Sequence, residues 1–111
     1  MPIKKTLKIG IVAGEHSGDR LGAGIIQALK SQNDIELFGV GGPKLVAQGL
    51  ISEFDFNKLN VMGIIEPLLN FRELNNLRKK LIKLFKEKEI DYFIGVDSPD
   101  FNMAIHKNMK A

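Results

Sequence analysis

The chain has 111 residues, of which 44% are hydrophobic and 26% are charged, and this composition is typical of one globular domain and does not favour a disordered chain. It contains no cysteine, which excludes disulfides, redox CxxC pairs and thiolate metal sites and fits a reducing cytoplasm. The net charge of +3 favours an anionic partner only weakly, and we expect no nucleic-acid partner.

The first predicted element is a buried strand over residues 7–13, which is rich in Ile and Val and ends at Gly14. Apolar residues then recur at helical spacing over residues 20–31, and Ser17 or Asp19 is a suitable N-cap for this helix. A strand, a glycine-rich turn and a helix together open a βαβ unit.

A second strand is predicted over residues 35–40, followed by a turn of two glycines and Pro43, which a helix accepts at its first position. Residues 44–48 predict a short helix that Gly49 ends. The stretch ISEFDF, residues 51–56, is interpreted as a short edge strand.

A long basic amphipathic helix is predicted over residues 66–88, because its apolar residues fall on one stripe between lysines and arginines. Such a stripe either packs against the core with its lysines in solvent, or inserts into an anionic membrane surface. Residues 92–96 predict a third buried strand, and residues 103–110 a last helix.

This order of elements predicts an α/β fold, a Rossmann-like parallel sheet with helices on both faces. Three strands make a small sheet, so we interpret the chain as part of a larger domain. No apolar run is long enough to span a membrane, and residues 1–8 lack the features of a signal peptide, so we expect a cytoplasmic protein.

Three loops follow the predicted strands and therefore lie at one edge of the sheet, where parallel sheets bind ligands: GEHSGD, GVGGP and VDSPD. The first loop matches neither the P-loop nor the GxGxxG pattern, and Glu15 and Asp19 would repel a phosphate. A sugar hydroxyl or an alcohol suits it better. Alternatively, its glycines only permit tight turns and close packing.

Asp97 follows a buried strand and precedes Pro99, so its carboxylate is a candidate general base toward a hydroxyl. The alternative is that Asp97 caps the next helix, and for Asp100 capping is the favoured interpretation. His16 and His106 have no metal-ligand spacing, and we assign neither a role.

Four stretches resemble, in order and at close spacing, the N-terminal part of the lipid-A-disaccharide synthase family: AGEHSGDRLGAG, FGVGGPKLVAQGL, LNVMGIIEPL and IDYFIGVDSPDFN. The resemblance implies an inverting glycosyltransferase of the GT-B type, with two Rossmann-like domains facing a cleft. Its substrates would be UDP-2,3-diacylglucosamine and 2,3-diacylglucosamine 1-phosphate (lipid X), with release of UDP and with no metal or other cofactor.

The resemblance also implies roles for single residues. Asp97 matches the proposed catalytic base, which takes the proton of the attacking sugar hydroxyl. The residues implied on the acceptor side of the cleft are Gly14, Glu15, Ser17, Gly18, Asp19, Met62, Gly63, Glu66 and Asp100.

Acylated substrates further imply peripheral contact with the cytoplasmic face of the inner membrane, through Leu68, Leu69 and Phe71. Three positions depart from the family: His16 replaces the usual Ala or Thr, Ser98 the usual Ala, and Pro67 the usual Val. None of them removes a proposed catalytic group, though His16 could change the acceptor contacts of its loop.

On this resemblance, residues 1–111 are part of the N-terminal, acceptor-side domain, and the UDP-binding domain is absent. We therefore expect the chain alone to be inactive and, with its sheet incomplete, marginally stable.

Two alternatives from other classes remain open. A flavodoxin-like receiver also has this length, but it needs acidic residues where Ala13 and Gly14 stand, to bind Mg²⁺. A dinucleotide-binding module of an oxidoreductase needs GxGxxG, and an acidic residue after its second strand.

Overall fold

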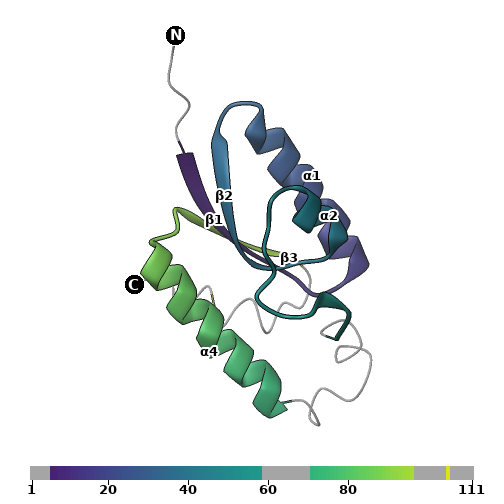
Figure 1. The fold of residues 1–111 in the computed structure, drawn as a ribbon, viewed down its shortest axis with the longest axis vertical. Helices are drawn as coiled ribbons and strands as arrows, with labels where there is room; N and C mark the ends of the chain where they lie inside the picture. The colour runs from purple at the N-terminus through teal and green to yellow at the C-terminus, as the bar shows by residue number, and fades with distance from the viewer. Residues whose placement is uncertain (1–5, 59–70, 97–104, 106–111) are drawn as a thin grey trace.

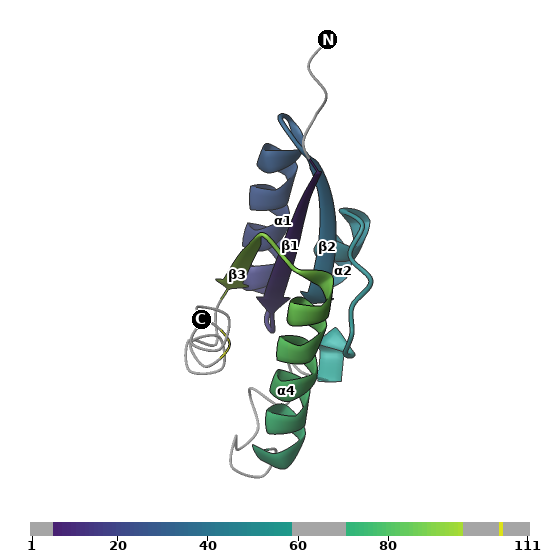
Figure 2. The same ribbon diagram turned by 90° about the vertical axis from the view of Figure 1, so that its left-hand side faces the viewer.

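Three parallel strands form the centre of the protein, in the spatial order β2-β1-β3, in a computed structural model that describes residues 6–58, 71–96 and 105. Helices α1 and α4 lie on opposite sides of this sheet (Figures 1 and 2). The predicted α/β fold, a Rossmann-like parallel sheet with helices on both faces, is confirmed. The elements are β1 (Thr6–Ala13), α1 (His16–Lys30), β2 (Asp34–Val40), α2 (Pro43–Ala47), α4 (Phe71–Lys88) and β3 (Tyr92–Val96).

Strand β1 occupies the middle of the sheet and is buried on both faces. It pairs in parallel with β2 on one side and with β3 on the other, so that Val12 lies opposite Val40 and Ala13 opposite Val96. Because neither face reaches water, the strand is an almost continuous apolar run, as the sequence predicts.

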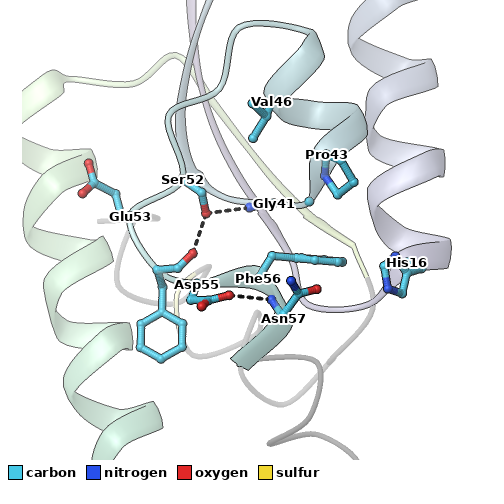
Figure 3. Close-up of a pocket in the computed structure, with 11 residues that line it drawn as sticks. His16, Gly41, Pro43, Val46, Ser52, Glu53, Asp55, Phe56 and Asn57 are labelled. Carbon is cyan, nitrogen blue, oxygen red and sulfur yellow. Dashed lines mark hydrogen bonds between the residues drawn. The ribbon is translucent and has the colours of Figure 1, made fainter.

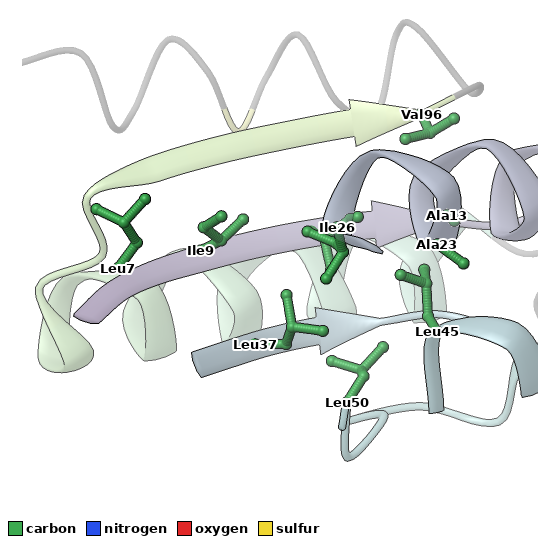
Figure 4. Packing of buried hydrophobic residues seen from close by; sticks show 10 residues of the cluster. Leu7, Ile9, Ala13, Ala23, Ile26, Leu37, Leu45, Leu50 and Val96 are labelled. Atoms are coloured by element: carbon green, nitrogen blue, oxygen red, sulfur yellow. The ribbon is translucent and has the colours of Figure 1, made fainter. Parts of the chain in front are cut away.

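Alternate residues of β1 supply two separate cores. On the first face, Ile9 and Ala13 pack with Ala23 and Ile26 of α1 (Figure 4). Further members of this cluster come from β2, α2 and the segment after α2: Leu37, Leu45 and Leu50. On the second face, Val12 packs with Leu77, Leu81 and Phe85 of α4.

Gly10 of β1 lets α4 come close to the second face of the sheet. A Cβ at this position would lie 2.8 Å from Cδ1 of Ile90 and 2.9 Å from Cε1 of Phe85. Any larger residue would therefore displace the end of α4. The helix ends at this point with Ile90 N–H donating to the carbonyl of Phe85 at 3.3 Å.

Helix α1 begins four residues before the predicted start, and the predicted N-cap at Ser17 or Asp19 is wrong. Glu15 is the N-cap residue, with extended backbone (φ −134°) and no capping hydrogen bond from its side chain. Asp19 N–H already donates to the carbonyl of Glu15 at 2.9 Å, so Ser17 and Asp19 lie inside the first turn.

Helix α2 follows its prediction closely. Pro43 is its first residue, and Gly49 ends it with a φ of +106°, a conformation that favours glycine. The turn is closed by Leu50 N–H, which donates to the carbonyl of Leu45 at 3.1 Å.

The predicted edge strand over residues 51–56 is wrong in extent, because a single parallel bridge joins Ser52 to Gly39 of β2. Asp55 then ends the extended path by accepting hydrogen bonds from the N–H groups of Asn57 and Lys58. Of the long helix predicted over 66–88, residues 71–88 are confirmed and 66–70 lie outside the described residues. The predicted helix over 103–110 lies outside them too, except for buried Ile105.

Candidate functional site

An open groove of about 590 Å³ lies at the edge of the sheet where the strands have their carboxyl ends. Because all three strands are parallel, the loops after β1 and β2 meet at this edge, as the sequence predicts. Figure 3 shows the groove between the start of α1, the start of α2 and the segment that follows α2. Its lining residues are His16, Gly41, Gly42, Pro43, Val46 and residues 52–57.

His16 and Phe56 form one wall of the groove. His16 is the first residue of α1, and its imidazole meets the Phe56 ring edge to face, with ring centroids 5.0 Å apart and planes at 78°. Phe56 is buried, with 7% of its surface exposed, whereas His16 is exposed. The histidine to which the sequence assigned no role therefore lies in the groove.

The polar rim is held by hydrogen bonds to its own backbone. The Ser52 hydroxyl accepts from Gly41 N–H at 3.2 Å and donates to the carbonyl of Phe54 at 2.7 Å (Figure 3). The Asp55 carboxylate accepts from Asn57 N–H at 2.9 Å. Glu53 N–H donates to the carbonyl of Gly39 at 2.8 Å, which fixes the rim to the end of β2.

Asp19 lies beneath the turn between β2 and α2. Its side chain is buried, with 1% exposed, and both carboxylate oxygens accept backbone hydrogen bonds. Oδ1 accepts from Gly42 N–H at 2.9 Å and Leu45 N–H at 3.0 Å, and Oδ2 accepts from Lys44 N–H at 2.9 Å. These N–H groups start α2 and would otherwise lack partners within the helix.

The structure brings part of the predicted site together. In the first loop, Gly14, Gly18 and Asp19 are buried, whereas Glu15 and Ser17 are exposed at the start of α1. Phe71 begins the described part of α4. The predicted residues that lie outside the described ones are Met62, Gly63, Glu66, Leu68, Leu69, Asp97 and Asp100.

Sequence reasoning missed residues 52–57, which form half of the groove. The alternation of polar and aromatic residues in SEFDFN follows the period of a strand and therefore predicts one. The signal for a turn was Asp55 two residues before Asn57, since an Asp side chain readily accepts the N–H two residues ahead.

The lining of the groove suits a ligand rich in hydroxyl groups. It combines the carboxylate of Asp55 with the amide of Asn57, and adds apolar surface from Pro43 and Phe56. The Glu53 carboxylate points toward α4 instead, where it pairs with Lys80 at 3.8 Å (Figure 3). The N–H groups at the start of α2 are occupied by Asp19, so they offer nothing to an anion. Within residues 6–58 and 71–96, no group of three His, Asp or Glu side chains is placed to hold a metal ion.

A comparison with protein families finds that the model of the lipid-A-disaccharide synthetase family matches residues 9–111. The match therefore covers nearly the whole chain, including the first loop, the groove and the stretch that contains Asp97.

Curated relatives agree with the family match. The chain is 47% identical to the lipid-A-disaccharide synthase of Vibrio campbellii over 109 residues, which are 97% of this chain and 29% of that protein. It is 48% identical over 107 residues to the enzyme of Aliivibrio fischeri, and 49% identical over 106 residues to that of Pseudomonas fluorescens. These alignments cover 96% and 95% of this chain and 28% of each relative. The chain thus spans less than a third of the length of the relatives it matches.

Proposed function

The chain belongs to the lipid-A-disaccharide synthetase family, and on that premise we propose that it is the acceptor side of a GT-B glycosyltransferase. The reaction transfers 2,3-diacylglucosamine from UDP-2,3-diacylglucosamine to the hydroxyl of lipid X. The bond from C1 to UDP breaks, UDP leaves with the electron pair, and the acceptor oxygen bonds to C1 with inversion.

The observation that carries this proposal is the family match over residues 9–111. The groove supports it, because carboxylate, amide and ring surfaces together suit sugar hydroxyls and the apolar face of a sugar ring. The alternatives of a receiver domain and of an oxidoreductase module gain no support from the comparisons.

We propose Asp97 as the general base of the transfer. It follows Val96, the last residue of β3, and Val96 pairs with Ala13 at the end of β1, directly before the first loop. In sequence, this base comes one residue after the carboxyl end of β3, and parallel sheets bind ligands at the edge formed by such strand ends. It would accept the proton of the acceptor hydroxyl as the new bond forms.

We also propose peripheral membrane contact through Leu68, Leu69 and Phe71, on the cytoplasmic face of the membrane that holds the acylated substrates. Lysines of the neighbouring α4, including Lys79, Lys83 and Lys86, are exposed and would face anionic lipid. No helix in the described parts of the chain has the length and apolarity needed to cross a bilayer.

A chimera tests the proposed transfer. The matching 109 residues of the Vibrio campbellii synthase are replaced by this chain, and UDP release is measured with both lipid substrates. We expect transfer by the chimera and none by the 111-residue chain alone. Asp97→Asn in the chimera should lower kcat by about 10² to 10⁴-fold, because the base is lost while the fold is kept.

The matched control is Asp34→Asn, which removes the same charge from an exposed position at the opposite edge of the sheet and should leave kcat unchanged. If the chimera is active and Asp97→Asn is as active as the control, Asp97 is not the base. If the chimera folds but transfers no sugar while the unaltered relative does, the proposed function is wrong.

A further inference from the structure

Asp19 is the one charged residue classed as buried within residues 6–58 and 71–96. Its carboxylate belongs to α1, yet all three hydrogen bonds described above go to the turn that leads into α2, 23 to 26 residues further along the chain. A buried charge is costly unless hydrogen bonds replace its water shell. The three N–H donors meet that requirement.

We infer that Asp19 is a positioning residue of the groove: it fixes the turn over residues 41–45, and through that turn it sets the places of Phe56 and His16. Its carboxylate does not touch the substrate, since both oxygens are engaged by backbone and the side chain is 1% exposed. The inference rests on the proposed function only for the class of ligand, a sugar that the groove contacts through its hydroxyl groups.

The contacts that transmit this effect are continuous. Gly42 lies between the carboxylate and the aromatic wall: a Cβ on it would be 2.7 Å from Oδ2 of Asp19 and 2.8 Å from Cε2 of Phe56. Phe56 in turn packs against His16, and Figure 3 shows both rings beside Pro43 at the start of α2. A shift of the Gly42 backbone therefore changes the space in which the Phe56 ring packs.

Only an aspartate carboxylate can accept all three of these N–H hydrogen bonds from this position. Asparagine would keep one oxygen for Gly42 and Leu45, but its NH₂ group would face Lys44 N–H, donor against donor. Glutamate would carry its carboxylate one carbon further from the α1 backbone, so its oxygens would not keep the positions from which Asp19 accepts these three N–H groups.

The first test needs no substitution. In the wild-type chain labelled with ¹⁵N and ¹³C, scalar couplings across the hydrogen bonds should connect the amides of Gly42, Lys44 and Leu45 to Cγ of Asp19. Absence of all three couplings in a folded sample would overturn the inference.

The second test measures amide hydrogen exchange in Asp19→Asn, in a Gly24→Ala background chosen to raise stability. We expect exchange at Gly42, Lys44 and Leu45 to be at least about tenfold faster, because hydrogen bonds to a charged acceptor are lost. Nuclear Overhauser contacts between the rings of His16 and Phe56 should disappear. The exchange rates of the Ile9 and Ile11 amides in β1 should stay within about twofold of those in the protein with Asp19 intact. All amides of the control Asp34→Asn should meet the same limit.

A uniform rise of exchange in every element, with the ring contacts intact, would mean that Asp19 only adds stability, and this would overturn the positioning role. If Asp19→Asn does not fold, Gly42→Ala tests the same contact from the other side. It should speed exchange at Lys44 and Leu45 and remove the ring contacts. If Gly42→Ala leaves these exchange rates and the ring contacts unchanged, the inference is equally overturned.

A titration separates this inference from the proposed function. Glucosamine 1-phosphate is added to the wild type and to Asp19→Asn, and the signals of His16 and Asn57 are followed. Weakening by at least about tenfold in the variant supports the positioning role, and equal affinity overturns it. If the wild type shows no binding, the sugar site is wrong, while the couplings and exchange rates still decide whether Asp19 holds the turn.

Discussion

Gly39 and Gly24 occupy opposite environments on two neighbouring elements. Gly39 in β2 has a φ of +136°, and a Cβ on it would lie 1.9 Å from the carbonyl oxygen of Ile11. Gly24 lies in α1, where a Cβ would have no atom within 4 Å. The first glycine is required by its surroundings, and the second is not.

We therefore predict opposite effects of alanine at these two positions. Gly39→Ala should lower the free energy of unfolding by more than about 2 kcal/mol, because the strained backbone and the clash with β1 add together. Gly24→Ala should raise it by about 0.5 to 1 kcal/mol, since alanine loses less backbone entropy in a helix. Urea unfolding followed by circular dichroism measures both, and a Gly39→Ala protein as stable as the wild type would contradict the described backbone.

The role of Asp19 is an example of a contact that the sequence alone does not predict. The sequence identifies an acid in a glycine-rich turn, and from that pattern we expected a helix cap or a contact with substrate. Its partners lie beyond Gly41, in a different element, and no local pattern reports a hydrogen bond across 26 residues. The structure shows its hold on the start of α2 directly, and both carboxylate oxygens are engaged in that hold.

The contact between β1 and α4 decides how closely these two elements pack. Gly10 leaves space that Phe85 and Ile90 fill, and Phe85 is fully buried. In a protein interior packed this closely, either a gap or an added methyl group lowers the free energy of unfolding.

Gly10→Ala should lower the free energy of unfolding by about 1 to 3 kcal/mol, because the new methyl group overpacks the interface. Adding Phe85→Leu removes the ring atoms that clash, so the double variant should lose less stability than the sum of the two single variants. Thermal or urea unfolding of the four proteins measures this coupling. Strict additivity would show that Gly10 and Phe85 do not meet.

The elements themselves were largely predictable, and the reasons are visible in single residues. Strand β1 is buried on both faces and gives an almost unbroken apolar run, and Pro43 and Gly49 mark the two ends of α2. The prediction that residues 92–96 form a buried strand is wrong in burial, because β3 lies at the edge of the described sheet and only Val96 in it is buried. The start of α1 was missed because Glu15 caps the helix with its backbone alone. Residues 51–56 were missed because one bridge to Gly39 depends on tertiary packing, which a pattern of alternating residues cannot distinguish from a full strand.

At the scale of the whole molecule, the basic residues gather on α4. This helix carries seven of the sixteen Lys and Arg residues but two of the thirteen acids, Glu73 and Glu87. A small net charge of +3 therefore conceals a distinctly basic helix, which begins at Phe71, one of the proposed membrane-contact residues. Both features favour the same partner, an anionic lipid surface.

The membrane proposal predicts that the chain floats with vesicles containing anionic lipid, and that Leu69→Glu with Phe71→Glu abolishes this. The acids would remove the inserted apolar surface and repel anionic headgroups. The control is Leu21→Glu, at a side chain on α1 that is 60% exposed. Flotation unaffected by the double substitution would contradict the proposal, and so would equal loss in the control.

The central position of β1 has a consequence for how the molecule is made. Its pairing with β2 joins residues 28 apart, such as Thr6 and Asp34, and the crossover through α1 is available early in synthesis. Its pairing with β3 is closed by Lys8 and Asp91, which exchange two hydrogen bonds across 83 residues. Until the ribosome has synthesised α4 and β3, one hydrogen-bonding edge of β1 lacks its partner strand, and the apolar face that α4 covers has no partner either. During that interval a second nascent chain can compete for the same edge, and the speed of translation through residues 41–96 sets how long the competition lasts.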